Sequence, residues 1–135
     1  MITEDYVSFE TAKLLKEKGF DEITFTWYTG KGKFCVGKNN FDDYHMNRFS
    51  NMATARDKNK CSAPTLQMAM KWLRKVHNIH VVPKFDFYAG DYTGRIYDGR
   101  RESTAEKDDY IAIVGNSTYE QASEAAIKYC LENLI

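Results

Sequence analysis

The chain has 135 residues, of which 43% are hydrophobic and 14% aromatic, and its 19 Lys and Arg residues balance 19 Asp and Glu residues to a formal net charge of zero. This length fits a single domain over residues 1–135, and the hydrophobic content excludes an intrinsically disordered chain. The neutral charge argues against a strongly basic nucleic-acid binder. It also removes the repulsion that keeps copies apart, so we expect that a homo-oligomer can form.

Three cysteines, Cys35, Cys61 and Cys130, are widely spaced and odd in number. This pattern indicates free thiols in a reducing compartment rather than a disulfide framework. No apolar run follows Met1, and no stretch approaches the roughly 20 apolar residues that span a bilayer. We therefore expect a soluble protein of the cytoplasm with no membrane partner.

The first elements follow from capping residues and periodicity. Ser8 can cap a helix that ends at Gly19, because glycine adopts the left-handed terminal conformation without strain. Alternation over residues 22–28 predicts a strand, and residues 33–36 a short return strand. Residues 37–61 have no clean period and predict a long irregular loop.

A second helix is predicted to begin near Ser62, with Pro64 in its first turn. Its broad apolar stripe includes Trp72, Val76 and His77, and Asn78 is placed to end it. The other members of the stripe are Leu66, Ala69, Met70 and Leu73.

The segment after Ile79 predicts a strand whose Pro83 marks an edge or a bulge. A turn over residues 89–94 and a return strand over residues 95–98 follow. After a polar loop over residues 99–107, the apolar run at residues 109–114 is the best candidate for a central strand.

Ser117 and Glu120 predict a capping box for the last helix, whose apolar stripe centres on alanines and Cys130. Short connections favour antiparallel pairing. The fold class predicted is α+β, a mostly antiparallel sheet of about five strands with three helices on one face, in the order α-β-β-α-β-β-β-α.

The second half resembles a double-stranded RNA-binding domain in its element order, α-β-β-β-α. That family holds phosphates with a lysine-rich start to its last helix. The matching positions here are Ser117–Glu120, followed by Glu124, and acids there repel phosphate. The resemblance therefore implies the topology, while the missing lysines argue against double-stranded nucleic acid as a partner.

Three segments, Val7–Phe20, Ala63–His77 and Tyr119–Ile135, resemble small proteins of phages and prophages of gut Bacteroidales. This resemblance implies a phage accessory protein that acts in the cytoplasm of a bacterial host. It carries over no functional residue, because the matching segments are helices of the scaffold.

Catalytic and metal-binding patterns are weak. His77 and His80 have a spacing seen in metal sites, with Cys61 upstream, but His77 falls in the apolar stripe and His80 on a strand, so we predict no metal. Cys61 lies near a helix start, where a dipole could lower its pKa. No phosphate loop, nucleophile elbow or metalloprotease motif occurs. We therefore predict no cofactor and no catalytic residue, and binding rather than catalysis.

Arginine and tyrosine residues of the long loop and of the later hairpin are the best candidates for a ligand site. Aromatic rings stack on bases, and guanidinium groups hold phosphate. A solvated face made of the same residues is the alternative. The predicted ligand-binding residues are Tyr44, Arg48, Phe49, Arg56, Lys58, Tyr92, Arg95, Tyr97, Arg100 and Arg101.

These residues, together with the phage resemblance, suggest an anti-defence protein that sequesters a nucleotide-like immune signal. Two alternatives stay open. One is an inhibitor or adaptor that binds a host protein through a sheet edge or the tyrosine-rich hairpin. The other is a nucleotide-degrading enzyme that uses Asp42, Asp43 and His45 as acid, base or metal ligands.

Overall fold

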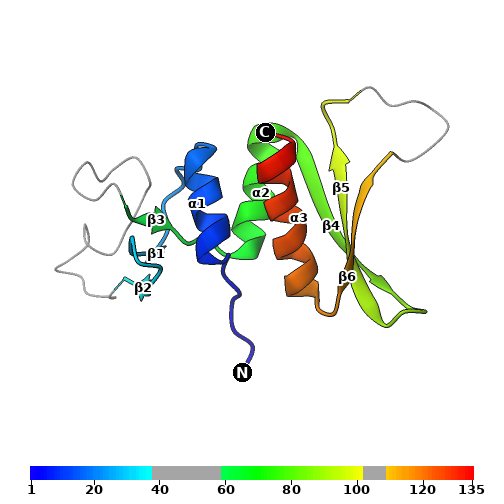
Figure 1. The fold of residues 1–135 in the computed structure, drawn as a ribbon, viewed down its shortest axis with the longest axis horizontal. Coiled ribbons are helices and arrows are strands. Elements are labelled where there is room, and N and C mark those ends of the chain that lie inside the picture. The colour runs from blue at the N-terminus through cyan, green and yellow to red at the C-terminus, as the bar shows by residue number, and fades with distance from the viewer. Residues whose placement is uncertain (38–58, 102–108) are drawn as a thin grey trace. The chain divides into compact units, whose positions relative to one another are not determined.

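The computed structural model describes residues 1–37, 59–101 and 109–135 (Figure 1). In these ranges the fold is α+β, with three helices and six antiparallel strands in two three-stranded sheets. The predicted class, helix number and antiparallel pairing are confirmed, although the strands form two sheets rather than one. The chain divides into two compact units, Met1–Thr65 and Leu66–Ile135, and the single domain over residues 1–135 stays a prediction.

Helix α1 (Phe9–Glu17) of the first unit begins and ends as its sequence predicts. The Ser8 side chain accepts a hydrogen bond from the Thr11 backbone N–H at 3.2 Å. Gly19 follows the helix with a φ of +91°, a conformation that residues with a Cβ rarely adopt. Thr11, Ala12 and Leu15 form its buried side.

The first sheet has the order β2-β1-β3 and contains β1 (Thr26–Tyr28), β2 (Phe34–Val36) and β3 (Cys61–Ser62). Strand β1 is shorter than the predicted strand at residues 22–28, whereas β2 is confirmed. Strand β3 was missed, because two residues are too few to show an alternating pattern. Its pairing with β1 depends on contact between distant parts of the chain.

The polar side of the β1 segment is the buried one. Thr24 and Thr26 are buried, while Ile23 and Phe25 are 54% and 55% exposed. Both buried hydroxyl groups have hydrogen-bond partners: Thr24 donates to the Thr26 carbonyl at 2.7 Å, and Thr26 donates to the Ala63 carbonyl at 2.6 Å.

Helix α2 (Leu66–His77) opens the second unit. It begins four residues later than predicted, because Ser62 belongs to β3 and the carbonyl of Pro64 accepts a hydrogen bond from Val7. The helix ends at His77, and Asn78 terminates it as predicted, with a φ of +53°. Most of the predicted stripe is buried, but Val76 is 58% exposed.

The second sheet contains β4 (Ile79–Asp86), β5 (Asp91–Asp98) and β6 (Ile111–Asn116) in the order β4-β5-β6. The edge position predicted from Pro83 is confirmed. The central strand predicted at residues 109–114 is wrong, because β6 is an edge and β5 lies in the middle. Strand β5 begins at Asp91 rather than at residue 95, since the pairing with β4 continues to Asp86 opposite Asp91.

Helix α3 (Tyr119–Asn133) has its capping box one residue later than predicted. The Thr118 hydroxyl accepts from the Gln121 backbone N–H at 3.0 Å, and the Gln121 side chain accepts from the backbone N–H of Thr118 at 3.2 Å. The pair is therefore Thr118 and Gln121, not Ser117 and Glu120. Ala122, Ala126 and Cys130 of the predicted stripe are buried.

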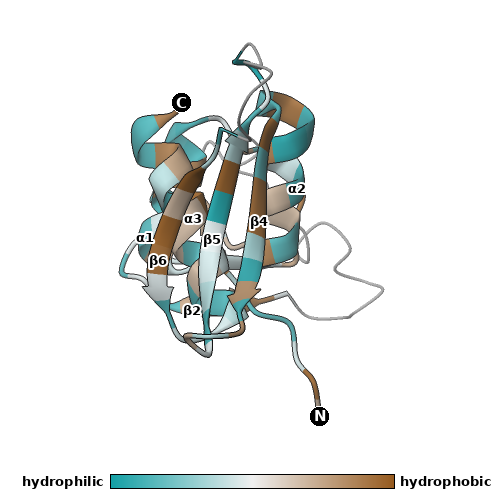
Figure 2. Ribbon diagram, turned by 90° about the vertical axis from the view of Figure 1, so that its right-hand side faces the viewer, coloured by the Kyte–Doolittle hydropathy of each residue, from teal (hydrophilic) through white to brown (hydrophobic). Residues whose placement is uncertain are grey.

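Helices α2 and α3 cover one face of the second sheet (Figure 2). Strand alternation divides the side chains between this helix face and an open face. Ile79, Val81 and Ile96 are buried on the helix face. Gly94 lies so close to α3 that an added Cβ would stand 2.8 Å from the Ala122 carbonyl oxygen.

Among the described residues, no helix combines the length and the apolar character needed to cross a bilayer.

Candidate functional site

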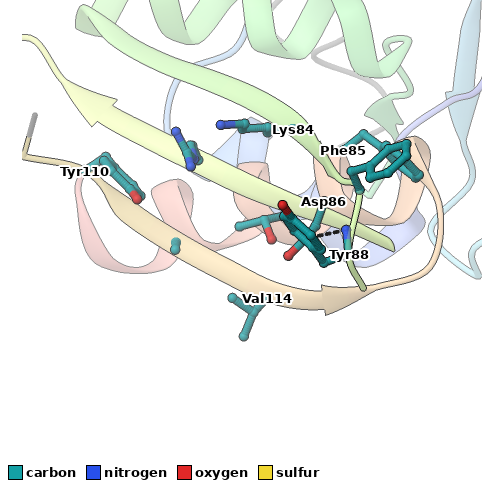
Figure 3. A pocket seen from close by; sticks show the side chains of 10 residues that line it. Lys84, Phe85, Asp86, Tyr88, Tyr110 and Val114 are labelled. Atoms are coloured by element: carbon teal, nitrogen blue, oxygen red, sulfur yellow. Dashed lines mark hydrogen bonds between the residues drawn. The ribbon is translucent and has the colours of Figure 1, made fainter. Parts of the chain in front are cut away.

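The turn between β4 and β5 displays two aromatic side chains. Asp86 holds the turn, because its Oδ1 accepts a backbone hydrogen bond from Tyr88 at 2.9 Å (Figure 3) and another from Ala89 at 3.1 Å. Gly90 completes the turn with a φ of +70° and donates to the Asp86 carbonyl. Phe87 is 85% exposed and Tyr88 fully exposed. Exposed aromatic side chains on an ordered turn are typical of a contact surface.

A cation and two tyrosines meet on the open face of the sheet. The Arg95 guanidinium lies 4.5 Å from the centre of the Tyr110 ring, within the range of a cation–π interaction. The rings of Tyr97 and Tyr110 lie 5.6 Å apart. Arg95 and Tyr97 come from β5, and Tyr110 immediately precedes β6, so strand pairing positions all three.

A pocket of about 510 Å³ lies between this face and the β4–β5 turn (Figure 3). This volume is within the usual range for small-molecule sites. Among the described residues, the cations Lys84 and Arg95 line it with a single carboxylate, that of Asp86, which already accepts hydrogen bonds from the turn. The remaining lining residues are aromatic, apolar or hydroxyl-bearing: Phe85, Phe87, Tyr88, Thr93, Tyr110, Ala112 and Val114.

The predicted hairpin residues divide between the two faces of the sheet. Arg95 lies in the pocket, and Tyr97 packs against the Tyr110 ring at its wall. Tyr92 faces the helices instead, since its ring packs against Phe85 at 5.2 Å and Tyr119 at 6.0 Å.

Arg100 and Arg101 do not join Arg95. The Arg100 Nε lies 2.9 Å from a carboxylate oxygen of Asp98, and its Nη2 donates to the Leu134 carbonyl at the end of α3. Arg101 lies 3.8 Å from the same carboxylate. The hydrogen bond from Arg100 holds the pKa of Asp98 below its usual range. Both arginines therefore bind Asp98 at the end of β5, and Arg100 also binds the end of α3; neither belongs to the pocket lining.

The other five predicted residues, Tyr44, Arg48, Phe49, Arg56 and Lys58, lie outside the described residues, as do Asp42, Asp43 and His45.

Lys84, Phe87, Tyr88 and Tyr110 are pocket residues that the sequence reasoning missed. The strand predicted from Ile79 onward ends at Asp86, so Phe87 lies in the turn that follows it. The aromatic run next to Ala89 and Gly90 is a signal that could have located the tip.

Two of the three thiols, those of Cys61 and Cys130, are buried and are poor nucleophiles. Cys61 lies in β3 and is 1% exposed, so burial raises its pKa despite the opposing charge of Lys16. The lowered pKa considered for Cys61 is therefore wrong. Burial raises the pKa of Cys130 to about 12.

The two histidines of the second unit have local partners. His77 packs edge-on against Trp72 at 4.7 Å, and burial lowers its pKa. A ring nitrogen of His80 shares a hydrogen bond with Asn78 at 2.9 Å. Within residues 1–37, 59–101 and 109–135, no three His, Cys, Asp or Glu side chains gather as metal ligands would.

Comparison of the chain with protein-family models, with curated proteins and with solved structures found no match.

Proposed function

We propose that this protein binds a nucleotide-like anion in the pocket on the open face of the β4-β5-β6 sheet. The observation that carries the proposal is the placement of Lys84 and Arg95 beside aromatic rings in a pocket of about 510 Å³. A phosphate group needs cationic or N–H donors, and a base needs a flat apolar surface. The pocket offers both in one place.

The charges of the pocket favour an anion. Asp86 is the one carboxylate among its described lining residues, and two backbone N–H groups of the turn already bind it. Within the described ranges, Lys84 and Arg95 have no ion-pair partner. Arg95 is held over Tyr110, which limits the side-chain entropy lost when a ligand binds.

The aromatic groups favour a planar ligand. Tyr88 is fully exposed and Phe87 nearly so, and both stand on a turn held by three hydrogen bonds. Stacking of a base on an aromatic side chain contributes about 1–3 kcal/mol. A ligand with a base and a phosphate can therefore contact the aromatic side chains of the β4–β5 turn and the open face of the sheet at the same time.

The biological role we propose combines the pocket with the phage resemblance: an accessory protein in a bacterial host cell that sequesters a nucleotide-like immune signal. Sequestration needs binding without turnover. Among the described residues that line the pocket there is no histidine or cysteine, and the carboxylate of Asp86 is engaged in the turn, which supports this role.

Titration calorimetry with a panel of mononucleotides, cyclic dinucleotides and ADP-ribose tests the proposal. We expect one of these compounds to bind, and Arg95→Ala to weaken its binding about 10- to 100-fold, the effect of losing a charged hydrogen bond. Tyr88→Ala should weaken it about 5- to 100-fold through lost stacking. Arg74→Ala, at an exposed position on α2, is the matched control and should bind like the wild type.

Absence of binding by every compound in the panel would contradict the proposal, as would equal affinity of the Arg95→Ala and Arg74→Ala variants. Recovery of the intact ligand after denaturation distinguishes sequestration from the alternative of a nucleotide-degrading enzyme.

Binding of a host protein is the second candidate function, and the exposure of the hairpin tip favours it. Phe87, Tyr88 and Val114 are each at least 72% exposed and belong to the same pocket lining. Aromatic residues of this kind dominate protein interfaces. Two results together would favour this alternative. A purified host protein binds the wild type but not the Phe87→Ala variant, and none of the nucleotides in the panel binds in the calorimetric titration.

A further inference from the structure

The two edges of the second sheet differ in chemistry. Strand β4 contains Pro83, which has no backbone N–H to donate, together with the charged Lys84 and Asp86. Proline and charge on an edge prevent pairing with other chains. Strand β6, Ile111–Asn116, contains neither proline nor a charged residue, so it lacks these protections.

The outer side of β6 pairs with no strand among the described residues, since β6 ends the order β4-β5-β6. Its open-face side chains are also uncovered. Val114 is 72% exposed and Tyr110, just before the strand, is 39% exposed. The backbone groups of this edge and the side chains beside them are therefore available to another strand.

We infer that the outer edge of β6 pairs antiparallel with β6 of a second copy of this chain, around a two-fold axis at Ala112. The absence of charge from this edge favours a second copy, because residues near a two-fold axis meet their own counterparts, where like charges repel. A strand without charged residues pairs with its own counterpart without this repulsion.

The pairing of β6 with β5 is irregular between Ile113 and Asn116. A centre at Ala112 limits the new pairing to residues 110–114 and leaves Gly115 outside it. It places Tyr110 opposite Val114 and Ile111 opposite Ile113 of the second copy. An aromatic side chain then packs against a β-branched one on the open face, a favourable cross-strand pair. A centre at Ile113 would instead pair Ile111 with Gly115, where a φ of +82° interrupts the extended backbone.

The resulting sheet has six strands, with both open faces on the same side. Tyr110, Ala112 and Val114 line the pocket, so the two pockets become neighbours across the axis. A contact of about five residues a side is much smaller than the 20–30 residues a side of a stable interface. The dimer is therefore weak and forms in a concentration-dependent manner.

Sedimentation of the ligand-free full chain, from about 10 µM to about 1 mM, tests the inference independently of nucleotide binding. The wild type should become dimeric in this range. Ala112→Glu and Ala112→Lys each put like charges together at the axis, and each should weaken dimerisation by roughly tenfold or more. An equimolar mixture of the two variants should restore the dimer, because opposite charges then meet. Ala112 is exposed, so neither change should unfold the chain.

Val82→Glu and Val82→Lys are matched controls, since Val82 lies on the same open face but on the β4 edge. They should dimerise like the wild type. A wild-type chain that stays monomeric at about 1 mM would overturn the inference, even if an unrelated extended peptide binds the edge. Failure of the mixed Ala112 variants to recover the dimer, or equal weakening by the Val82 variants, would also overturn it.

Discussion

Both faces of the β4-β5-β6 sheet contain tyrosines, and the surroundings of these tyrosines differ between the faces. On the helix face Tyr92 packs between Phe85 and Tyr119, while on the open face the Tyr110 ring supports the Arg95 guanidinium. Residue type therefore does not distinguish a structural side chain from one available to a ligand. What distinguishes them is the parity of the residue's position in the strand, because alternate side chains point to opposite faces of the sheet.

The arginines show the same contrast. Arg100 is bound by Asp98 and by the end of α3, whereas Arg95 reaches the pocket. Only five positions separate them in the sequence. Strand β5 ends at Asp98 between them, so Arg95 follows the alternation of the strand and Arg100 does not.

The largest difference between the faces should appear in stability. Ile96 is 1% exposed on the helix face, so Ile96→Ala should lower the free energy of unfolding by about 2–5 kcal/mol through lost burial and a cavity. Val82→Ala, at a half-exposed position on the open face, should change it by no more than about 0.5 kcal/mol. Urea denaturation measures both values, and equal losses would contradict the division into faces.

A smaller difference in the free energy of unfolding should separate the alanine variants of the two arginines. Arg100→Ala removes the hydrogen bonds to Asp98 and Leu134 and should cost about 1 kcal/mol, because Arg100 is partly exposed and water screens the charges. Arg95→Ala should cost less, about 0.5 kcal/mol, because only an exposed cation–π contact is lost. Ligand affinity should follow the opposite order. If the same variant shows the larger loss in both stability and ligand affinity, the structural role of Arg100 and the binding role of Arg95 are not separate.

The smallest expected effect is in the pH dependence of stability. His77 has a pKa lowered from 6.5 by burial, so its unfolded form binds protons more readily, and stability should fall as pH drops below about 6.5. The pKa of Asp98 is lowered from 3.8 by its hydrogen bond to Arg100, so its contribution is present above about 3.8 and is lost as pH falls below that value.

Thermal denaturation across pH separates these two contributions. His77→Gln should flatten the dependence just below pH 6.5, and Asp98→Asn should flatten the acid limb. If the pH dependence of stability is the same in the His77→Gln variant as in the wild type, this histidine does not cause the loss of stability below about pH 6.5.

The sequence by itself determined the elements whose signals are local. Ser8 and Gly19 bound α1, Asn78 ends α2, and Pro83 marks an edge, because capping, left-handed backbone and a missing N–H act on neighbouring residues. The α+β class and the order of the larger elements followed from the same signals.

Contacts between distant residues decided the rest. Tertiary pairing made Cys61–Ser62 a strand instead of a helix start and placed β5 rather than β6 at the centre of its sheet. It also separated Arg95 from Arg100 and brought Lys84 and Tyr110 together. The physical reason is that strand neighbours and pocket walls depend on which segments pair, and no local preference of the chain encodes that pairing.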